Sequence, residues 1–132
     1  MGCIHPFISE ALAYCGHGDQ ILIADGNYPV HANCPNAQQV FLGLRAGIPT
    51  VTEVLETLLT EINVEAAKVM IPEDGSKPEI FTNFEQLLPG MELKNLGRFE
   101  FYEAAAHPKV RLVISTGEQR VYANILLTVG VA

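Results

Sequence analysis

Three short apolar runs constrain the fold of this chain more than any other feature of its sequence. They cover residues 20–25, 110–115 and 123–129, and Ile, Val and Leu dominate all three. A strand with one face in water alternates apolar and polar residues, whereas a strand covered on both faces forms a nearly continuous apolar run. The three runs therefore predict strands that are buried within a layered structure.

Segments with helical spacing of apolar residues separate these strands. The predicted helices cover residues 6–16, 50–60, 80–88 and 99–106. A further strand is expected at 66–71, and residues 72–78, rich in Gly, Pro and charge, are expected to form a surface loop. The sequence thus predicts an α/β fold in which helices flank a mostly buried β-sheet, and a length of 132 residues predicts a single domain over 1–132.

Composition and charge exclude several classes of partner. A net charge of −7 with only 8 Lys and Arg argues against a nucleic-acid partner, which needs a concentrated basic surface. No apolar run approaches the length of a membrane span, and Met1–Pro6 lacks a basic leader followed by an apolar core. The odd number of cysteines, Cys3, Cys15 and Cys34, favours reduced thiols. We expect a cytoplasmic protein with no membrane or nucleic-acid partner.

The densest polar signal is Gly16-His17-Gly18-Asp19, where a predicted helix ends and a buried strand begins. Flanking glycines allow a ligand to approach the imidazole closely, and an imidazole transfers protons readily near neutral pH. Alternatively, His17 only stabilises the helix C-terminus. Asp25 has a similar pair of interpretations, capping the next turn or binding a ligand, and His31 is either a site residue or an exposed loop histidine.

Cysteines and histidines cluster in the first quarter of the chain, but their spacing does not indicate a zinc site. Pairs separated by one residue are strained as ligands of one tetrahedral metal. Cys15 and His17 are also too close in sequence to meet readily as a nucleophile and its base. Phosphate-binding, dinucleotide-binding and serine-hydrolase motifs are lacking from the sequence. We therefore predict no metal site.

A second polar group lies toward the other end of the chain. Arg98 precedes an aromatic segment, and Tyr122-Ala123-Asn124 leads into the last strand. Arg, Tyr and Asn together suit a ligand covered in hydroxyl groups. For Phe99 and Phe101 we predict positions in the core, since their segment has helical spacing.

In this order the motifs resemble the D-ribose pyranase / L-fucose mutarotase family over nearly the whole chain. The residues that carry the resemblance are Gly16-His17-Gly18-Asp19, Asp25 with Pro29, Arg98-Phe99 with Phe101-Tyr102-Glu103, and Thr116-Gly117-Glu118 through Tyr122-Ala123-Asn124-Ile125-Leu126-Leu127. The resemblance implies an isomerase that interconverts the anomers of an aldose, and its pyranose and furanose forms, by acid/base ring opening without a cofactor.

The resemblance also implies roles for particular residues. His17 would be the proton donor, Asp25 and Arg98 would bind the sugar, and Tyr122, Ala123 and Asn124 would line the same site. The second proton carrier stays open between Tyr122, an ordered water and a carboxylate. The resemblance further implies a ring-shaped homo-oligomer, commonly a decamer, with sites near subunit contacts, and a mean hydropathy of +0.21 agrees with assembly.

The identity of the sugar is divided between two types. Arg98 with its aromatic neighbours and Tyr28-Pro29-Val30-His31 favour L-fucose or a related sugar, whereas Tyr122-Ala123-Asn124 is the form associated with D-ribose. Gly26 departs from the Ala usual after the aspartate. Two non-enzymatic hypotheses remain: a sugar-binding accessory of transport, and a structural ring component.

Overall fold

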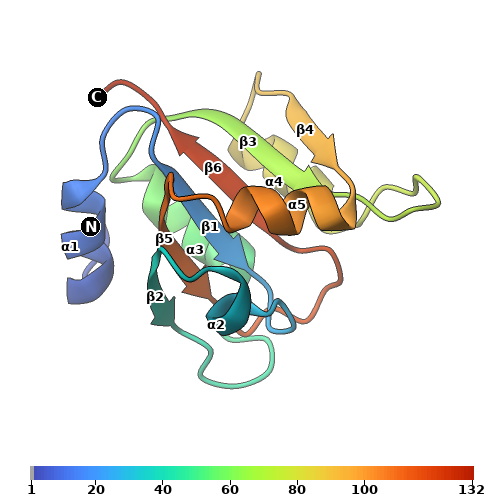
Figure 1. Ribbon diagram of the computed structural model, residues 1–132, viewed down its shortest axis with the longest axis horizontal. Coiled ribbons are helices and arrows are strands. Elements are labelled where there is room, and N and C mark those ends of the chain that lie inside the picture. The colour runs from blue at the N-terminus through green and yellow to red at the C-terminus, as the bar shows by residue number, and fades with distance from the viewer. Residues whose placement is uncertain (1) are drawn as a thin grey trace.

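A mixed six-stranded sheet runs through the centre of the molecule (Figure 1). The computed structural model describes residues 2–132. The strands are β1 (Gln20–Ala24), β2 (Gln38–Phe41), β3 (Val64–Met70), β4 (Leu93–Leu96), β5 (Val110–Ser115) and β6 (Ile125–Val129), in the spatial order β2-β5-β1-β6-β3-β4. β6 is antiparallel to both β1 and β3, and the other neighbouring strands are parallel.

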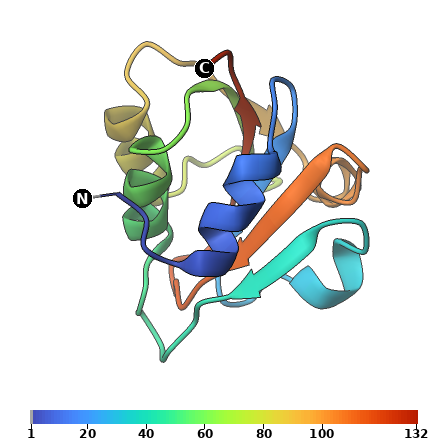
Figure 2. The ribbon, with the colours of Figure 1, turned by 90° about the vertical axis from the view of Figure 1, so that its left-hand side faces the viewer.

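Helices cover both faces of this sheet. They are α1 (Pro6–Tyr14), α2 (Val30–Asn33), α3 (Val51–Leu59), α4 (Ile80–Leu87) and α5 (Arg98–Ala105). Buried residues of α1, α3 and α4 pack in one apolar cluster, and those of α2 and α5 pack in another. Figure 2 shows α3 and α4 on one side of the sheet and α2 on the other. The predicted α/β layered fold is therefore confirmed.

The central position of β1 explains why its residues 21–24 are all apolar and buried. Ile21 and Ile23 belong to the cluster under α1, α3 and α4, whereas Leu22 and Ala24 belong to the cluster under α2 and α5. Successive side chains of a strand point to opposite faces, so a strand covered on both sides has no position for a polar side chain. The three predicted apolar strands are β5, β1 and β6, which are neighbours in the centre of the sheet.

The elements missed by the sequence analysis are short or lie at the sheet edges. The strands β2 and β4 were not predicted, because an edge strand is partly in water and these two contain mostly polar or exposed residues. The four-residue helix α2 is too short for a periodic pattern. β3 begins at Val64 rather than at residue 66, and β6 begins at Ile125 rather than at residue 123.

The predicted core position of Phe99 was wrong, whereas that of Phe101 was right. Phe99 is 77% exposed and Phe101 is 0% exposed. Residues two apart on a helix differ by roughly 200° in direction, so both cannot face the sheet. The buried face of α5 follows Phe101 and Ala105 instead.

The chain after β5 is held tightly against the loop at 43–49. The Gly47 N–H donates to the Gly117 carbonyl at 2.6 Å, and the Gly117 N–H donates to the Pro49 carbonyl at 3.0 Å. A Cβ at Gly117 would lie 2.6 Å from the Ile48 carbonyl oxygen. Only glycine allows this approach, which fixes where the segment leading to β6 begins.

Gly117→Ala is therefore expected to lower the free energy of unfolding by about 1–3 kcal/mol, because the added methyl group forces backbone atoms apart. Urea denaturation measures the change. Gly16→Ala is the control, since a Cβ there would meet only the Asp19 carboxylate at 3.9 Å. Equal losses in the two variants would contradict the close approach at Gly117.

Candidate active site

A cavity of about 280 Å³ opens at the edge of the sheet where β1 ends and β6 begins. Its lining residues are Asp25, Asn27, Tyr28, Met70, Arg98, Tyr102, Val121, Tyr122 and Asn124. Asp25 directly follows β1, Met70 ends β3, and Arg98 begins α5. In open α/β sheets, ligands bind beyond the carboxyl ends of the strands. This cavity lies at that end of β1 and β3.

The floor of this cavity is a buried pair formed by Asp25 and Asn124. The Asn124 Oδ1 accepts from the Asp25 backbone N–H at 2.8 Å, and the Asn124 Nδ2 donates to the Asp25 Oδ2 at 3.3 Å. The Asn27 N–H donates to the other carboxylate oxygen at 3.0 Å. These contacts fix both side chains in place.

Burial raises the pKa of the Asp25 carboxyl, and hydrogen bonds from backbone N–H groups, including those of Asn27 and Ala123, offset part of that increase. The carboxylate therefore presents a strong, oriented acceptor to a ligand. Ala123 contributes only backbone to this arrangement, since its side chain is fully buried in the apolar core.

Tyr122 and Arg98 form the wall above this floor. Tyr122 has a φ of 56°, and it is the only non-glycine residue with a positive φ within residues 2–132. Such a conformation is uncommon for a tyrosine and concentrates at functional sites. The Arg98 Nε donates to the Tyr102 hydroxyl at 3.4 Å, and the guanidinium carbon lies 5.6 Å from the centre of the Tyr102 ring. Four predicted site residues thus converge on one cavity: Asp25, Arg98, Tyr122 and Asn124.

Tyr28, Met70 and Tyr102 also line the cavity, although the sequence analysis did not assign them to it. Tyr28 is buried, its hydroxyl accepts from the Asn33 Nδ2 at 3.0 Å, and burial raises its pKa well above its ordinary value. Two signals could have pointed to Tyr28: its nearness to Asp25 in sequence, and its place in the Tyr28-Pro29-Val30-His31 segment that favours the fucose type.

His17 lies near the opposite end of β1, before the strand begins. It precedes β1, whereas Asp25 follows it, and at roughly 3.3 Å per residue a five-residue strand separates the two by about 15 Å or more. His17 lines a different cavity, of about 570 Å³, between α1, α3 and the end of β6. Within one chain, His17 therefore does not reach a ligand held by Asp25.

The remaining candidate residues from the first quarter of the chain lie outside the cavity. His31 is exposed on α2, with its Nδ1 3.2 Å from the Gln39 Oε1. Burial raises the pKa of the Cys15 thiol and raises that of Cys34 to about 11, which disfavours the nucleophilic thiolate at both positions.

No three His, Cys, Asp or Glu side chains within residues 2–132 are grouped to hold a metal ion. No helix in that range is long and apolar enough to cross a bilayer.

An ion pair between buried Glu118 and partly exposed Arg120 holds the segment that carries Tyr122. The sequence alone did not predict this pair. Glu118 Oε1 accepts from the Arg120 Nη2 at 2.9 Å and from the Val51 N–H at 3.2 Å. Glu118 Oε2 accepts from the Arg120 Nε at 3.1 Å. The pair thereby ties the β5–β6 connection to the first residue of α3. No local pattern links Glu118 to Val51, so the contact depends on the fold.

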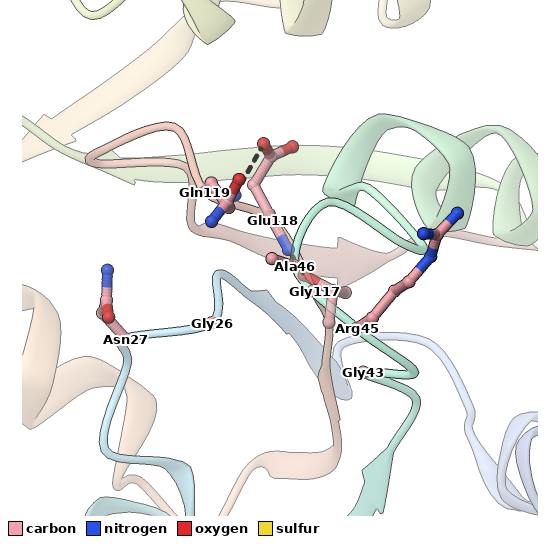
Figure 3. A pocket seen from close by; sticks show the side chains of 9 residues that line it. Gly26, Asn27, Gly43, Arg45, Ala46, Gly117, Glu118 and Gln119 are labelled. Atoms are coloured by element: carbon pink, nitrogen blue, oxygen red, sulfur yellow. Dashed lines mark hydrogen bonds between the residues drawn. The ribbon is translucent and has the colours of Figure 1, made fainter.

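A third cavity, of about 350 Å³, lies beside this ion pair and shares Asn27 with the first. Asn27 and Arg45 stand on opposite sides of it (Figure 3). Its floor is the backbone of Gly26, Gly43 and Gly117.

Comparison with known proteins places the chain among sugar isomerases. Residues 1–132 match the RbsD / FucU transport protein family. The chain is 36% identical over 131 residues to D-ribose pyranase of Streptomyces coelicolor, covering 98% of this chain and 95% of that protein. It is 34% identical over 139 residues to human fucose mutarotase, covering 97% and 89% respectively.

Solved structures agree with the sequence matches. Bacillus subtilis RbsD complexed with D-ribose superposes with a TM-score of 0.88 at 30% identity, covering 100% of this chain and 97% of that one. The fucose mutarotase of Streptococcus pneumoniae in complex with L-fucose gives a TM-score of 0.82 at 28% identity, covering 98% and 94%. The chain belongs to the RbsD/FucU family and is an isomerase of the pyranase and mutarotase type.

Glu118→Ala is expected to lower the free energy of unfolding at pH 7 by about 1.5–3 kcal/mol, the range for hydrogen bonds to charged groups. Burial alone would raise the pKa of Glu118, but the hydrogen bonds from Arg120 and from backbone N–H groups outweigh it and lower the pKa. A carboxyl whose pKa is lowered by folding stabilises the protein above its unfolded pKa, and this stabilisation is lost as pH falls through the folded pKa.

The difference between wild type and Glu118→Ala should therefore shrink below about pH 4, near the unfolded pKa of a glutamate. Urea denaturation at pH 7 and in the acid range measures it. Glu85→Ala is the control, because Glu85 pairs with Lys77 in an exposed bridge worth about 1 kcal/mol or less. A pH-independent loss in Glu118→Ala would show that the ion pair is not its cause.

Proposed function

We propose that this protein catalyses the mutarotation of L-fucose or a related aldose, with Asp25, Arg98, Tyr122 and Asn124 holding the sugar. The observation that carries this proposal is the convergence of these four side chains, distant in sequence, on one cavity. Carboxylate, guanidinium, phenol and amide groups supply both donors and acceptors, which suits a ring of hydroxyl groups.

Ring opening requires two proton transfers. The anomeric hydroxyl loses a proton while the ring oxygen gains one, and the steps reverse after the carbonyl has turned. His17 and Tyr122 are the pair we propose for these transfers, with Asp25 and Asn124 orienting the sugar. General acid/base help of this kind contributes about 10²–10⁴ in rate.

We further propose that each site is shared by two copies of the chain, one supplying His17 and the other the cavity. The separation of His17 from Asp25 across β1 supports this arrangement. Two apolar side chains at or beside the cavity are exposed. Val121, a lining residue, is 67% exposed, and Phe99, whose ring centre lies 6.5 Å from that of the lining residue Tyr102, is 77% exposed. On the His17 side, Tyr14 at the end of α1, next to the cavity-lining Cys15, is also largely exposed. Large exposed apolar side chains near both half-sites favour their burial by a neighbouring copy.

Such a contact joins two different surfaces, so it repeats from copy to copy and closes into a ring when the rotation allows. The decamer that the family resemblance implies contains contacts of this kind. We also propose a cytoplasmic location, in keeping with three cysteines that are all unpaired.

The sugar preference rests on the wall of the cavity. Met70 and Val121 are apolar lining residues that suit the C6 methyl group of L-fucose, and Arg98 matches the fucose-type position. D-Ribose is the second candidate, favoured by Tyr122-Ala123-Asn124 and by the D-ribose pyranases among the relatives.

The proposed activity predicts that the protein accelerates exchange between sugar anomers, measured by NMR saturation transfer on L-fucose, D-ribose and other aldoses. His17→Asn should lower the rate by about 10²–10⁴, the usual contribution of a general acid or base. His31→Asn is the matched control, because His31 lies outside both cavities, and it should keep the wild-type rate. Sugar binding without exchange would instead favour the transport accessory, and no binding at all would favour a structural ring component.

The shared site predicts complementation between two inactive variants. His17→Asn and Asp25→Asn, unfolded together and reassembled, should recover about a quarter of wild-type exchange, the share of contacts that pair an intact His17 with an intact Asp25. Each variant reassembled alone should stay inactive. Failure of the mixture to recover activity, with mixed assemblies verified by mass spectrometry, would contradict the shared site.

A further inference from the structure

The backbone around His17 is held firmly from two sides. The Gly18 N–H donates to the Val129 carbonyl at 2.9 Å, and the Val129 N–H donates to the Asp19 carbonyl at 2.8 Å. The Asp19 carboxylate also accepts from the Gly16 N–H at 2.8 Å. Gly18 has a φ of 91°, which a residue with a side chain rarely adopts. The backbone position of His17 is therefore fixed, and its imidazole can still rotate.

The Glu65 carboxylate lies in contact with this imidazole. His17 Nε2 lies 2.6 Å from Glu65 Oε1. The pairing of β3 with β6 shifts register between Val64 and Ala66, so Glu65 is the extra residue of a bulge. A bulge turns a side chain away from its regular direction and is common beside active sites.

Gly130, which follows β6, leaves room for the Glu65 side chain. A Cβ on Gly130 would lie 3.3 Å from the Glu65 Cβ, closer than ordinary packing allows. The glycine that follows β6 and the irregularity in β3 therefore both determine where the Glu65 side chain lies. An exposed ion pair of this kind adds little to stability.

We propose that Glu65 is a positioning residue that fixes the tautomer of His17, with Nε2 protonated and Nδ1 free to exchange protons with the sugar; this rests on the proposed function. The Glu65 carboxylate lies against Nε2, and its negative charge favours the tautomer that carries the proton on that nitrogen. The imidazole side chain is still 60% exposed, which leaves Nδ1 open to a ligand from a neighbouring copy.

In the ring-opening step, each proton that leaves one group is taken up by another. Neutral His17 takes the proton of the anomeric hydroxyl at Nδ1 and becomes an imidazolium, whose charge lies beside the Glu65 carboxylate. When the ring closes, this imidazolium is the proton donor. The ring oxygen receives its proton from the second carrier, and closure of the ring on the other face returns both protons. Glu65 exchanges no proton; it orients the ring and stabilises its transient positive charge.

Two measurements test this proposal. The first is 15N NMR of histidine-labelled protein without sugar, with the His17 signals assigned by their loss in His17→Asn, at a pH where the ring is neutral. Wild type should show the Nε2–H tautomer, and Glu65→Ala should show a mixture. An unchanged tautomer in Glu65→Ala would overturn the proposal.

The second measurement is the anomer-exchange rate. Glu65→Ala should lower the rate at saturating sugar by about 10–100-fold, as the loss of a partner that orients a functional histidine does elsewhere, with half-saturation unchanged. Glu65→Gln keeps an acceptor oxygen and should retain more of the rate. Glu56→Ala, which removes an equal charge from an exposed position on α3, should match wild type.

The outcomes separate this proposal from the proposed function. Full activity in Glu65→Ala, or equal losses in Glu65→Ala and Glu65→Gln, would overturn the role of Glu65 while leaving mutarotation intact. If wild type exchanges no aldose, the proposed function fails, and the tautomer measurement still decides whether Glu65 governs the imidazole.

Discussion

The burial of β1 on both faces is the constraint on which the rest of the structure depends. Its side chains are shared between two apolar clusters, so a shift of its register would move side chains to the wrong face of the sheet. Everything of chemical interest is attached to its two ends. His17 precedes the strand and Asp25 follows it, and a rigid strand keeps them about 15 Å or more apart. The molecule therefore carries the two proposed half-sites, His17 and the Asp25 cavity, at opposite ends of β1.

The two half-sites are built in different ways. Around Asp25 the polar groups are buried and mutually satisfied, and no buried side-chain nitrogen or oxygen within residues 2–132 lacks a hydrogen-bond partner. Such a network is rigid, because losing any one contact leaves a buried polar group unpaired. The Glu118–Arg120 pair extends this rigidity to the segment that carries Tyr122. Around His17 the backbone is fixed but the imidazole and Glu65 are exposed. Rigidity suits the recognition of a sugar, and exposure suits a group offered to a neighbouring copy.

The reaction proposed for this member of the RbsD/FucU family consists of proton transfers. Opening a hemiacetal requires only that protons leave one oxygen and reach another, and side chains supply both transfers. The protein must therefore hold the imidazole so that one particular nitrogen faces the sugar. In the proposed arrangement, where one copy supplies His17 and another the cavity, that geometry depends on assembly.

The sequence by itself determined the layered α/β fold, the three central strands and the identity of four residues around the cavity, because continuous apolar runs and ordered motifs are local properties. It did not determine the short edge strands, the exposure of Phe99, or the contacts of Glu118 and Glu65. Those depend on which segments meet after folding: Glu118 reaches Val51, and Glu65 reaches His17 through a bulge that only strand pairing creates. The distance between His17 and Asp25 was likewise decided by the tertiary structure, since eight positions of sequence span the sheet only when the chain between them is extended.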